Sequence, residues 1–315
     1  MKMIPHLRPL LLACLAAFST IQAQQPAGTQ AEPTPEQQAD LVKKIEERKK
    51  LVDSFGWSTE GNGKLGPHAE IVIPKGWRFT GPDGTRKLMQ LYENPPTDIE
   101  MGMLAQAEGI GSPPWIIFEF RDTGYVKDDE KDSLDADALL ESLQEGQKEG
   151  NKFRRDQGLN ELEVIGWAIP PRYNTQTNNL EWATKIRTIG APPDAYNINF
   201  NTRLLGRRGV MEVTLVCDPE ELNDMIAEQA KILTGYSYIQ GERYAEYQSG
   251  DKIAEYGLTA LVAGGGAYAL AKSGLLGKLG LIFAKMGKAA ILLVVGVFVA
   301  IKKLFSKLFG FRQSE

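Results

Sequence analysis

Histidine and cysteine are the residues that this sequence has least of, and their scarcity excludes several kinds of site. The 315 residues include two of each. His6 falls in a segment that we predict to be a signal peptide, so His68 alone remains in the mature chain. One histidine cannot form a histidine metal cluster, and any histidine-based catalytic triad would have to use His68. We therefore predict no metal site.

The cysteines exclude an internal disulfide. Cys14 lies in the same predicted signal, which leaves Cys217 without a partner in the mature chain. Export normally permits disulfides, but a domain of this size can bury enough core to be stable without them. Cys217 ends the apolar alternating run VMEVTLVC, which favours a small buried side chain over a reactive thiol.

Other signatures of chemistry are also missing. The sequence contains neither a GxSxG nucleophile motif nor a Walker or dinucleotide-binding glycine motif. Its formal net charge is −4, and its basic excess lies near the C-terminus. Proteins that bind a phosphate backbone normally carry a basic domain. We therefore predict no cofactor and no nucleic-acid partner.

The N-terminus has the three-part layout of a secretory signal over residues 1–23. Lys2 and Arg8 come first, an apolar run covers residues 10–18, and Ile-Gln-Ala at residues 21–23 is a plausible cleavage site. This pattern predicts that the following domain is exported.

A lipoprotein signal ending at Cys14 is the alternative, although the apolar segment before that cysteine is very short. Residues 24–34 are rich in glutamine, proline, alanine and threonine without periodicity, which predicts a flexible lead. Regular structure is expected to begin at Pro35, with a helix.

The C-terminal quarter has the apolar length of a membrane anchor. A helix that rises about 1.5 Å per residue needs roughly 20 apolar residues to cross hydrocarbon. Residues 257–276 are interrupted only by Lys272, and residues 279–301 carry Lys285 and Lys288 near their start, where long side chains reach headgroups. We predict an anchor within residues 257–305 that contacts the lipid bilayer.

Two arrangements of this anchor are open. One is a transmembrane helical hairpin with Lys278 in its turn, and the other is a single span preceded by an interfacial helix. Residues 306–315 form a basic tail. Lysines flank both sides of the apolar run, so the positive-inside rule does not choose an orientation.

The part between signal and anchor, residues 35–235, mixes helical and strand patterns. This order predicts an α+β domain in which helices pack on a mixed, largely antiparallel sheet. Helices are expected at residues 35–55, 85–92, 134–155 and 220–232. Strands are expected at residues 69–73, 77–80, 101–107, 115–121, 162–169, 180–186, 195–205 and 210–216.

Several side chains are expected in the core of this domain. The aromatic and β-branched strand WIIFEFR at residues 115–121 should be central in the sheet. The buried stripe of the helix at residues 134–155 should consist of Leu139, Leu140, Leu143 and Phe153. The tryptophans expected first as core residues, and second as pocket walls, are Trp115, Trp167 and Trp182.

Residues 236–256 connect the domain to the predicted anchor and contain several tyrosines. They are Tyr236, Tyr238, Tyr244, Tyr247 and Tyr256. Aromatic residues with polar tips suit the depth of lipid headgroups. Packing of these tyrosines against the domain is the alternative.

Three arginines around a glycine-bounded turn are the candidate ligand-binding residues: Arg203, Arg207 and Arg208. Arginine forks near such a turn suit a carboxylate or phosphate, including a lipid headgroup or a cell-wall polymer. The alternative is that Gly206 and Gly209 shape the turn while the arginines stay solvated or pair with Glu212 and nearby acids.

An acidic run at residues 128–137 has oxygen ligands at alternate positions, as calcium loops do. It departs from an EF-hand because Ser133 stands where glycine is needed and Leu139 where the bidentate acid belongs. We interpret the run as a solvated turn followed by acids that favour a helix N-terminus.

Several motifs resemble those of a known family. They are FRDTGYVKDD at residues 120–129, VIGWA at 164–168, PPRY at 170–173, LEWA at 180–183, NTRLLGRRGV at 201–210 and AEYGL at 254–258. With them the chain resembles, over nearly its whole mature length, the bacterial membrane-anchored proteins grouped as domain of unknown function 2167. The resemblance implies a location in the bacterial inner membrane, with the main domain exported to the periplasmic side. It implies no activity, cofactor or catalytic residue.

The leading hypothesis for function is a non-enzymatic binding module of the bacterial envelope, with an envelope protein or polymer as partner. A competing hypothesis is a hydrolase or transferase that uses paired carboxylates, with Asp122 beside Arg121 as the place to look. A third is a membrane protein whose anchor drives oligomerisation.

Overall fold

The structure is a computed structural model that describes residues 34–263 except residues 110, 176 and 178. Its chain divides into two units, residues 1–48 and residues 49–315. Three predicted segments lie outside the described residues: the signal, residues 24–33 of the lead, and residues 264–315 of the anchor and tail. Within the described part, no helix has the length and apolar character needed to span a membrane.

The helices begin close to the residues that the sequence indicates. They are α2 (Pro35–Asp53), α3 (Pro82–Leu91), α4 (Ala136–Asp156), α5 (Leu222–Leu233) and α6 (Leu258–Val262). Short 3₁₀ turns cover Pro219–Glu221 and Tyr244–Glu246. Helix α3 begins at Pro82 rather than at residue 85, because proline fits the first turn of a helix, where its missing N–H is not needed.

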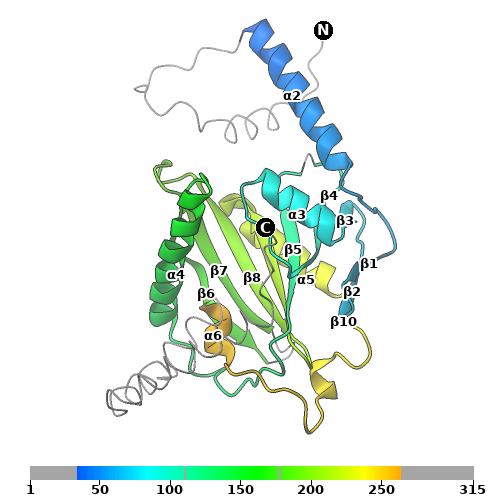
Figure 1. Cartoon of the computed structure of the whole chain (residues 1–315), viewed down its shortest axis with the longest axis vertical. Coiled ribbons are helices and arrows are strands. Elements are labelled where there is room, and N and C mark those ends of the chain that lie inside the picture. The colour runs from blue at the N-terminus through cyan, green and yellow to red at the C-terminus, as the bar shows by residue number, and fades with distance from the viewer. Residues whose placement is uncertain (1–33, 110, 176, 178, 264–315) are drawn as a thin grey trace, which may run out of the picture. The chain divides into compact units, whose positions relative to one another are not determined.

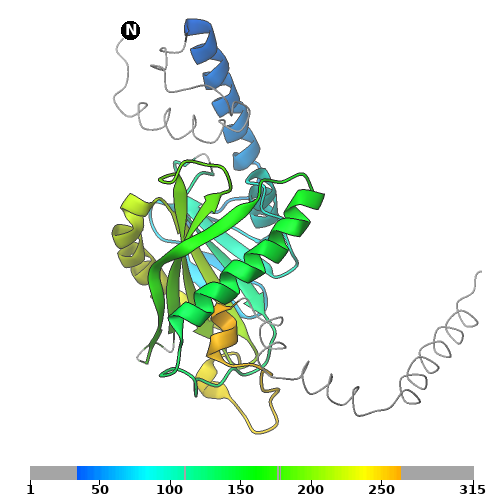
Figure 2. The ribbon, with the colours of Figure 1, turned by 90° about the vertical axis from the view of Figure 1, so that its left-hand side faces the viewer.

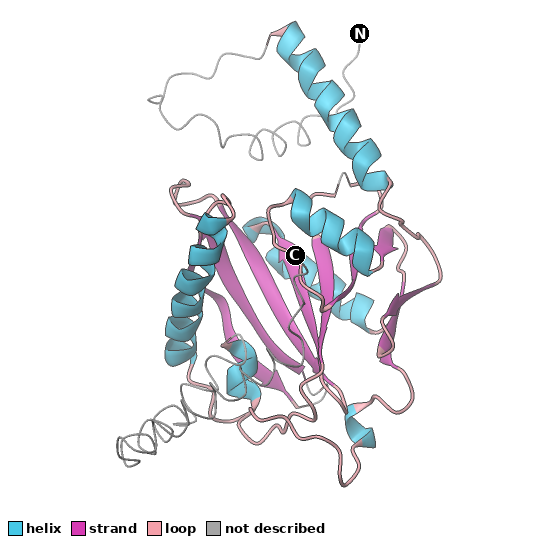
Figure 3. Ribbon diagram, in the orientation of Figure 1, coloured by secondary structure: helices cyan, strands magenta, loops and turns pink. Residues whose placement is uncertain are grey.

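Ten strands form two sheets (Figure 3). They are β1 (Asn62–Leu65), β2 (Ala69–Val72), β3 (Trp77–Thr80), β4 (Glu100–Gln106), β5 (Trp115–Arg121), β6 (Leu162–Asn174), β7 (Asn179–Thr188), β8 (Tyr196–Leu205), β9 (Val210–Cys217) and β10 (Tyr236–Tyr238). The larger sheet has the order β3-β4-β5-β9-β8-β7-β6, and every neighbouring pair is antiparallel. The predicted α+β class with an antiparallel sheet is confirmed, and β5 lies inside the sheet as expected.

The large sheet packs on both faces (Figures 1 and 2). Its back face packs against α5 and the small sheet β1-β2-β10, in a core that includes Ile71, Phe118, Met211 and Ile232. Its front face carries α3 at the β3–β5 side and α4 with α6 at the β6–β7 side. The expected core positions of Trp115 and Trp182 are confirmed, and Trp167 packs at the edge of the core around α4.

The tyrosines of residues 236–256 pack against the domain, which is the second of the two alternatives above. Tyr236–Tyr238 forms β10, which pairs with β2. The buried Tyr238 hydroxyl donates to the Leu204 carbonyl at 2.7 Å and accepts from the Met211 N–H at 3.0 Å. Tyr244 stacks on Tyr125 with ring centroids 4.5 Å apart. This segment is therefore an integral part of the fold.

Two expectations about side chains and strand ends were wrong. Phe153 is 51% exposed, because the inward stripe of α4 runs from Leu139 to Asn151 and Arg154. The Asn151 side chain exchanges hydrogen bonds with the Leu162 backbone, and Arg154 donates to the Asn160 carbonyl. The strand at residue 162 continues through Pro170 and Pro171 to Asn174. Proline is tolerated there because β6 is an edge strand with register shifts in its pairing.

The first residues of the predicted anchor belong to the core of the domain. Leu258, Leu261 and Val262 of α6 are almost fully buried and share a core with Leu139 and Trp182. Glu130 accepts a hydrogen bond from the Thr259 N–H at 2.8 Å, which satisfies a free donor at the start of α6. The described chain is thus held to the sheet as far as Val262.

The packing of α6 predicts the effect of Leu261→Ala. Removing a fully buried leucine side chain should lower the free energy of unfolding by about 2–5 kcal/mol, measured by urea denaturation of the detergent-solubilised chain. Ile253→Ala is the matched control, because Ile253 is 44% exposed, and it should change stability by less than about 0.5 kcal/mol. Equal stability of both variants would show that α6 is not part of the domain core.

Candidate functional site

Charged side chains from four neighbouring strands form one row across the large sheet. Strand register places Arg203 of β8 opposite Glu212 of β9, Glu212 opposite Glu119 of β5, and Glu119 opposite Glu100 of β4. Residues directly opposite each other in antiparallel strands point to the same face. All four side chains therefore belong to the front face, and we call them the charged row.

Glu212 is the centre of the charged row. Its side chain is buried, and Oε1 accepts a hydrogen bond from Arg121 Nε at 2.8 Å. The same oxygen lies 3.6 Å from Arg203 Nε. Two guanidinium groups thus share one carboxylate oxygen, which compensates the cost of burying that negative charge.

Arg203 is a buried cation with incomplete hydrogen bonding. Its side chain is 9% exposed, and its guanidinium lies over the Trp182 ring, 4.6 Å from the centroid. Nε and Nη1 are enclosed and have no hydrogen-bond partner. Burial lowers the pKa of Arg203, but arginine stays protonated at neutral pH. An enclosed donor without a hydrogen-bond partner is costly, so the burial of Arg203 calls for an explanation.

Glu119 lies beside Arg203 and Glu212 but is not paired as they are. It has no hydrogen bond or ion pair among the described residues. Burial, with the neighbouring negative charge of Glu212, raises the pKa of Glu119 to about 7, although Arg203 and Arg121 act in the opposite direction. Near neutral pH the sheet therefore holds a partly protonated Glu119 on the strand next to the salt-bridged Glu212.

Glu100, at the end of the charged row, is buried but receives several hydrogen bonds. Burial alone would raise its pKa, but hydrogen bonds from the Thr97 N–H at 2.5 Å, the Thr97 hydroxyl at 2.9 Å and Arg86 Nε at 3.2 Å lower the pKa of Glu100. Arg86 comes from α3. This glutamate is thus ionised and paired, and Arg86 compensates its charge.

The charged row continues into a polar stripe that the described helices leave uncovered. Figure 1 shows β8 and its neighbours between α4 and α3, without a helix across them. The partly exposed side chains of this stripe include Asn201 and Thr214, which are opposite each other and joined by a hydrogen bond of 3.3 Å. Asn201 also donates to the Asn199 carbonyl at 3.0 Å. The stripe therefore presents hydrogen-bonding groups beside Arg203.

The other two candidate arginines, Arg207 and Arg208, lie in the turn between β8 and β9. Arg207 binds Asp251 through Nε at 2.7 Å and Nη2 at 2.8 Å, which lowers the pKa of Asp251 to about 2. Arg208 forms an ion pair with Glu242. These two arginines fasten residues 242–251 to the sheet, whereas Arg203 belongs to the charged row.

Gly209 allows this turn to approach β5. A Cβ atom at Gly209 would lie 2.1 Å from the Arg121 carbonyl oxygen, so a larger residue would displace the backbone. Gly206 similarly leaves room for the Tyr238 ring. All three candidate arginines thus pair with acids, and Glu212 is the partner of Arg203.

His68 lies in a separate polar group on the back of the sheet. Its ring stacks on Phe120 with centroids 3.6 Å apart, and Nδ1 lies 3.5 Å from Glu242 Oε2. Burial, followed by the charge of Arg208, lowers the pKa of His68, so the ring is neutral at pH 7. Within the described residues, no group of three or more histidine, cysteine, aspartate or glutamate side chains is placed to hold a metal ion.

Other candidate residues have structural positions. Asp122 is exposed, and its backbone carbonyl accepts from Lys252 Nζ at 3.4 Å. Cys217 is buried, and burial raises the pKa of its thiol to about 12. In the acidic run, Asp135 accepts from the Ala138 N–H and begins α4, as the sequence indicated for helix N-terminal acids.

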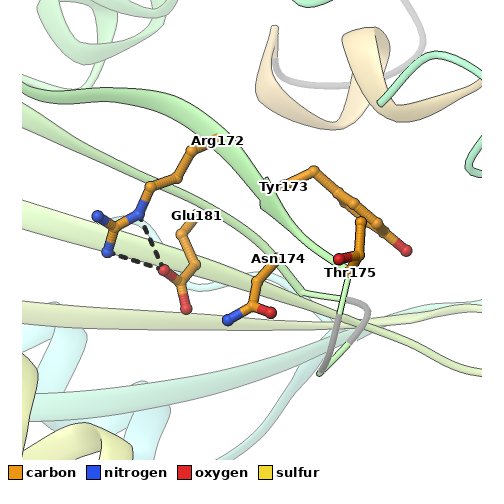
Figure 4. Close-up of a pocket in the computed structure, with 5 residues that line it drawn as sticks. All are labelled: Arg172, Tyr173, Asn174, Thr175 and Glu181. Atoms are coloured by element: carbon orange, nitrogen blue, oxygen red, sulfur yellow. Dashed lines mark hydrogen bonds and ion pairs between the residues drawn. The ribbon is translucent and has the colours of Figure 1, made fainter. Parts of the chain in front are cut away.

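A hollow of about 520 Å³ lies at the ends of β6 and β7 (Figure 4). Its lining residues are Arg172, Tyr173, Asn174, Thr175 and Glu181. Arg172 and Glu181 point toward each other and form a salt bridge of 3.0 Å, while Tyr173 points away and donates to Asp128 at 3.2 Å. The hollow includes no residue of the charged row.

Sequence reasoning missed Glu119 and Glu212 as site residues. Each is an acid inside an apolar strand, WIIFEFR or VMEVTLVC. The available signal was a single charged residue at a strand position that should be buried. Their adjacency depends on the register of β5 with β9, which the sequence does not reveal.

Comparisons with known proteins identify a family but no activity. A family model described as "Protein of unknown function (DUF2167)" matches residues 58–298. No curated protein matches the chain. Among solved structures, the solution structure of cyanobacterial PsbP from Synechocystis sp. PCC 6803 matches with a TM-score of 0.34 and 9% identity, over 54% of this chain and 86% of that chain. A likeness at that TM-score carries no argument about function.

The raised pKa of Glu119 predicts a pH-dependent effect of Glu119→Gln. Because the folded state holds this proton more tightly than the unfolded chain, wild-type stability should fall as pH rises from about 4.5 to about 7. Glu119→Gln removes that loss and should be more stable than wild type by about 1–3 kcal/mol at pH 8, with a smaller difference at pH 4.5. Urea denaturation across this pH range measures the difference.

The matched control is Glu145→Gln, at an exposed position of α4. It should leave the pH dependence of stability unchanged. If the stability difference between Glu119→Gln and wild type is the same at pH 4.5 and pH 8, Glu119 does not carry the shifted proton.

Proposed function

The chain belongs to the DUF2167 family, and we propose that it is a membrane-tethered binding module of the bacterial envelope. In this proposal the exported domain recognises an envelope protein or polymer through the front face of its large sheet. The apolar residues after the domain hold it at the inner membrane, with residues 279–301 as a single span. The first helix of a hairpin would need residues 257–276, and Leu258–Val262 belong to the domain core.

The observation that carries the binding role is the unsatisfied polarity of the front face. A solvated stripe between α3 and α4 contains a buried arginine with two enclosed nitrogens that lack partners. Buried polar groups in native proteins are nearly always satisfied, and an exception calls for an explanation. A partner cannot reach these two enclosed nitrogens, but it can supply an acceptor to the third nitrogen of Arg203, Nη2, which is not enclosed.

The tether is supported by sequence and by the position of α6. Residues 279–301 have the length of a membrane span, with lysines near their start. The chain is fixed in the domain core as far as Val262, so little free chain separates the domain from the apolar residues that follow. Such a short connection would keep the domain close to the bilayer.

Binding fits the geometry better than catalysis does. Glu119 and Glu212 are neighbouring carboxyls, one of them with a raised pKa, as in acid and base catalysts, but they lie on a sheet face with Glu212 engaged by two arginines. Asp122, the residue that the sequence marked for catalysis, is exposed at the end of β5. A surface that recognises a partner needs no closed cavity.

Cell fractionation tests the tether. The full chain should sediment with membranes, resist high salt and alkaline washing, and enter solution only with detergent. A chain that ends at Ala263 keeps α6 and should be recovered from the soluble envelope fraction. Recovery of the intact mature chain in solution without detergent would contradict the proposal.

A further inference from the structure

We propose that Arg203 and Arg121, together with Glu119, form a binding site for a carboxylate group of a partner molecule. This inference rests on the binding role proposed above and names the chemistry that the front face recognises. It does not depend on the tether.

The charges of the site leave room for one anion. Arg203 and Arg121 are opposed by the ionised Glu212, while Glu100 is paired with Arg86 of α3. With Glu119 protonated, these groups carry one net positive charge. A single carboxylate therefore neutralises the site, whereas a phosphate dianion would leave an excess negative charge at a partly buried position.

The arginine donors are placed to receive that carboxylate. Arg203 Nη2 has no hydrogen bond among the described residues. Unlike Nε and Nη1 of the same side chain, it is not enclosed by the protein. Nη2 is therefore the nitrogen of Arg203 that keeps some contact with solvent. Arg121 is 43% exposed and uses Nε for Glu212, which leaves its amino groups available. Planar guanidinium groups bind carboxylates with good geometry.

The surroundings of the site add specificity. Trp182 supports the Arg203 guanidinium from one side, and the hydrogen-bonded pair of Asn201 and Thr214 lies on the same face. A protonated Glu119 donates a hydrogen bond to a carboxylate oxygen, whereas an ionised Glu119 repels it. These features favour a carboxylic acid whose neighbouring groups bond to amides and hydroxyls.

The protonation of Glu119 makes this binding dependent on pH. The charged groups that face Glu119 are Glu212 of β9, Arg203 of β8, Glu100 of β4 and Arg121 of its own strand β5. Arg121 and Arg203 keep their charges between pH 6 and pH 8, and Glu100, whose pKa is lowered, is ionised throughout this range. Loss of the Glu119 proton therefore removes both the hydrogen-bond donor and the net positive charge.

Binding of acetate to the full chain in detergent tests the site. Acetate should produce a saturable change in tryptophan fluorescence, with a dissociation constant in the millimolar range, because so small an anion can gain only a few kcal/mol. Affinity at pH 8 should be about tenfold lower than at pH 6, following the protonated fraction of Glu119. Trp182→Phe should remove the signal, because Trp182 contacts Arg203.

Variants separate this site from other arginines. Arg203→Gln should abolish the response, and Arg121→Gln should weaken it at least tenfold. Because both arginines contact buried Glu212, circular dichroism of each variant must first show that it is folded. Glu119→Gln should bind acetate equally well at pH 6 and pH 8. Arg172→Gln, in the hollow of Figure 4, is the matched control and should bind as wild type does.

Several outcomes would overturn the inference. The first is that chloride at equal ionic strength reproduces the response to acetate. The second is that phosphate binds as tightly as acetate, and the third is that Arg121→Gln binds acetate as tightly as wild type. Absence of any saturable response in wild type would also overturn it. If the wild-type chain still sediments with membranes in that case, the carboxylate site fails while the tether stands.

Discussion

The shared contact of Arg121 and Arg203 with Glu212 is the interaction on which the front face depends. A glutamate in the middle of a seven-stranded sheet is buried whether or not it is paired, and an unpaired buried charge costs several kcal/mol. Glu212 can remain ionised there because cations from β5 and β8 reach the same carboxylate oxygen. The register of three strands is therefore tied to charge compensation as well as to apolar packing.

This constraint has consequences on both sides of the sheet. On the front face, the row of charges interrupts the apolar surface between the core under α3 and the core under α4 and α6. A helix laid across that row would bury its charges further without new partners, and the described helices lie to either side (Figure 1). The back face is apolar and accepts α5 and the small sheet. The sheet thus has apolar cores on both faces and a polar stripe on its front face.

Much of this architecture could be predicted from the sequence because it follows from local patterns. Aromatic and β-branched residues marked β5, alternating apolar residues marked β9, and an apolar stripe marked α4. Strand β10 could not be found this way, because three residues show no period and the strand exists only through its pairing with β2. Phe153 was placed on the wrong face because polar Asn151 and Arg154 take the inward positions to bond backbone groups near β6.

The candidate site was predictable in part. The sequence singled out Arg203, Arg207 and Arg208 by their glycine-bounded turn, but their different roles depend on partners distant in the chain. Asp251 and Glu242 reach Arg207 and Arg208 only after residues 239–256 fold back on the sheet. The proximity of Glu119 and Glu212 likewise arises from strand pairing, which no local pattern encodes.

A double-mutant cycle between Arg203 and Glu212 tests most directly whether these charges act as one unit. The stabilities of Arg203→Met, Glu212→Gln and the double variant are compared with wild type by urea denaturation. Each single variant should lose about 3–5 kcal/mol, because it leaves a buried charge with fewer partners, and the double variant should lose less than the sum by at least about 1.5 kcal/mol. Losses that add within about 0.5 kcal/mol would show that the two residues do not interact and would contradict the account.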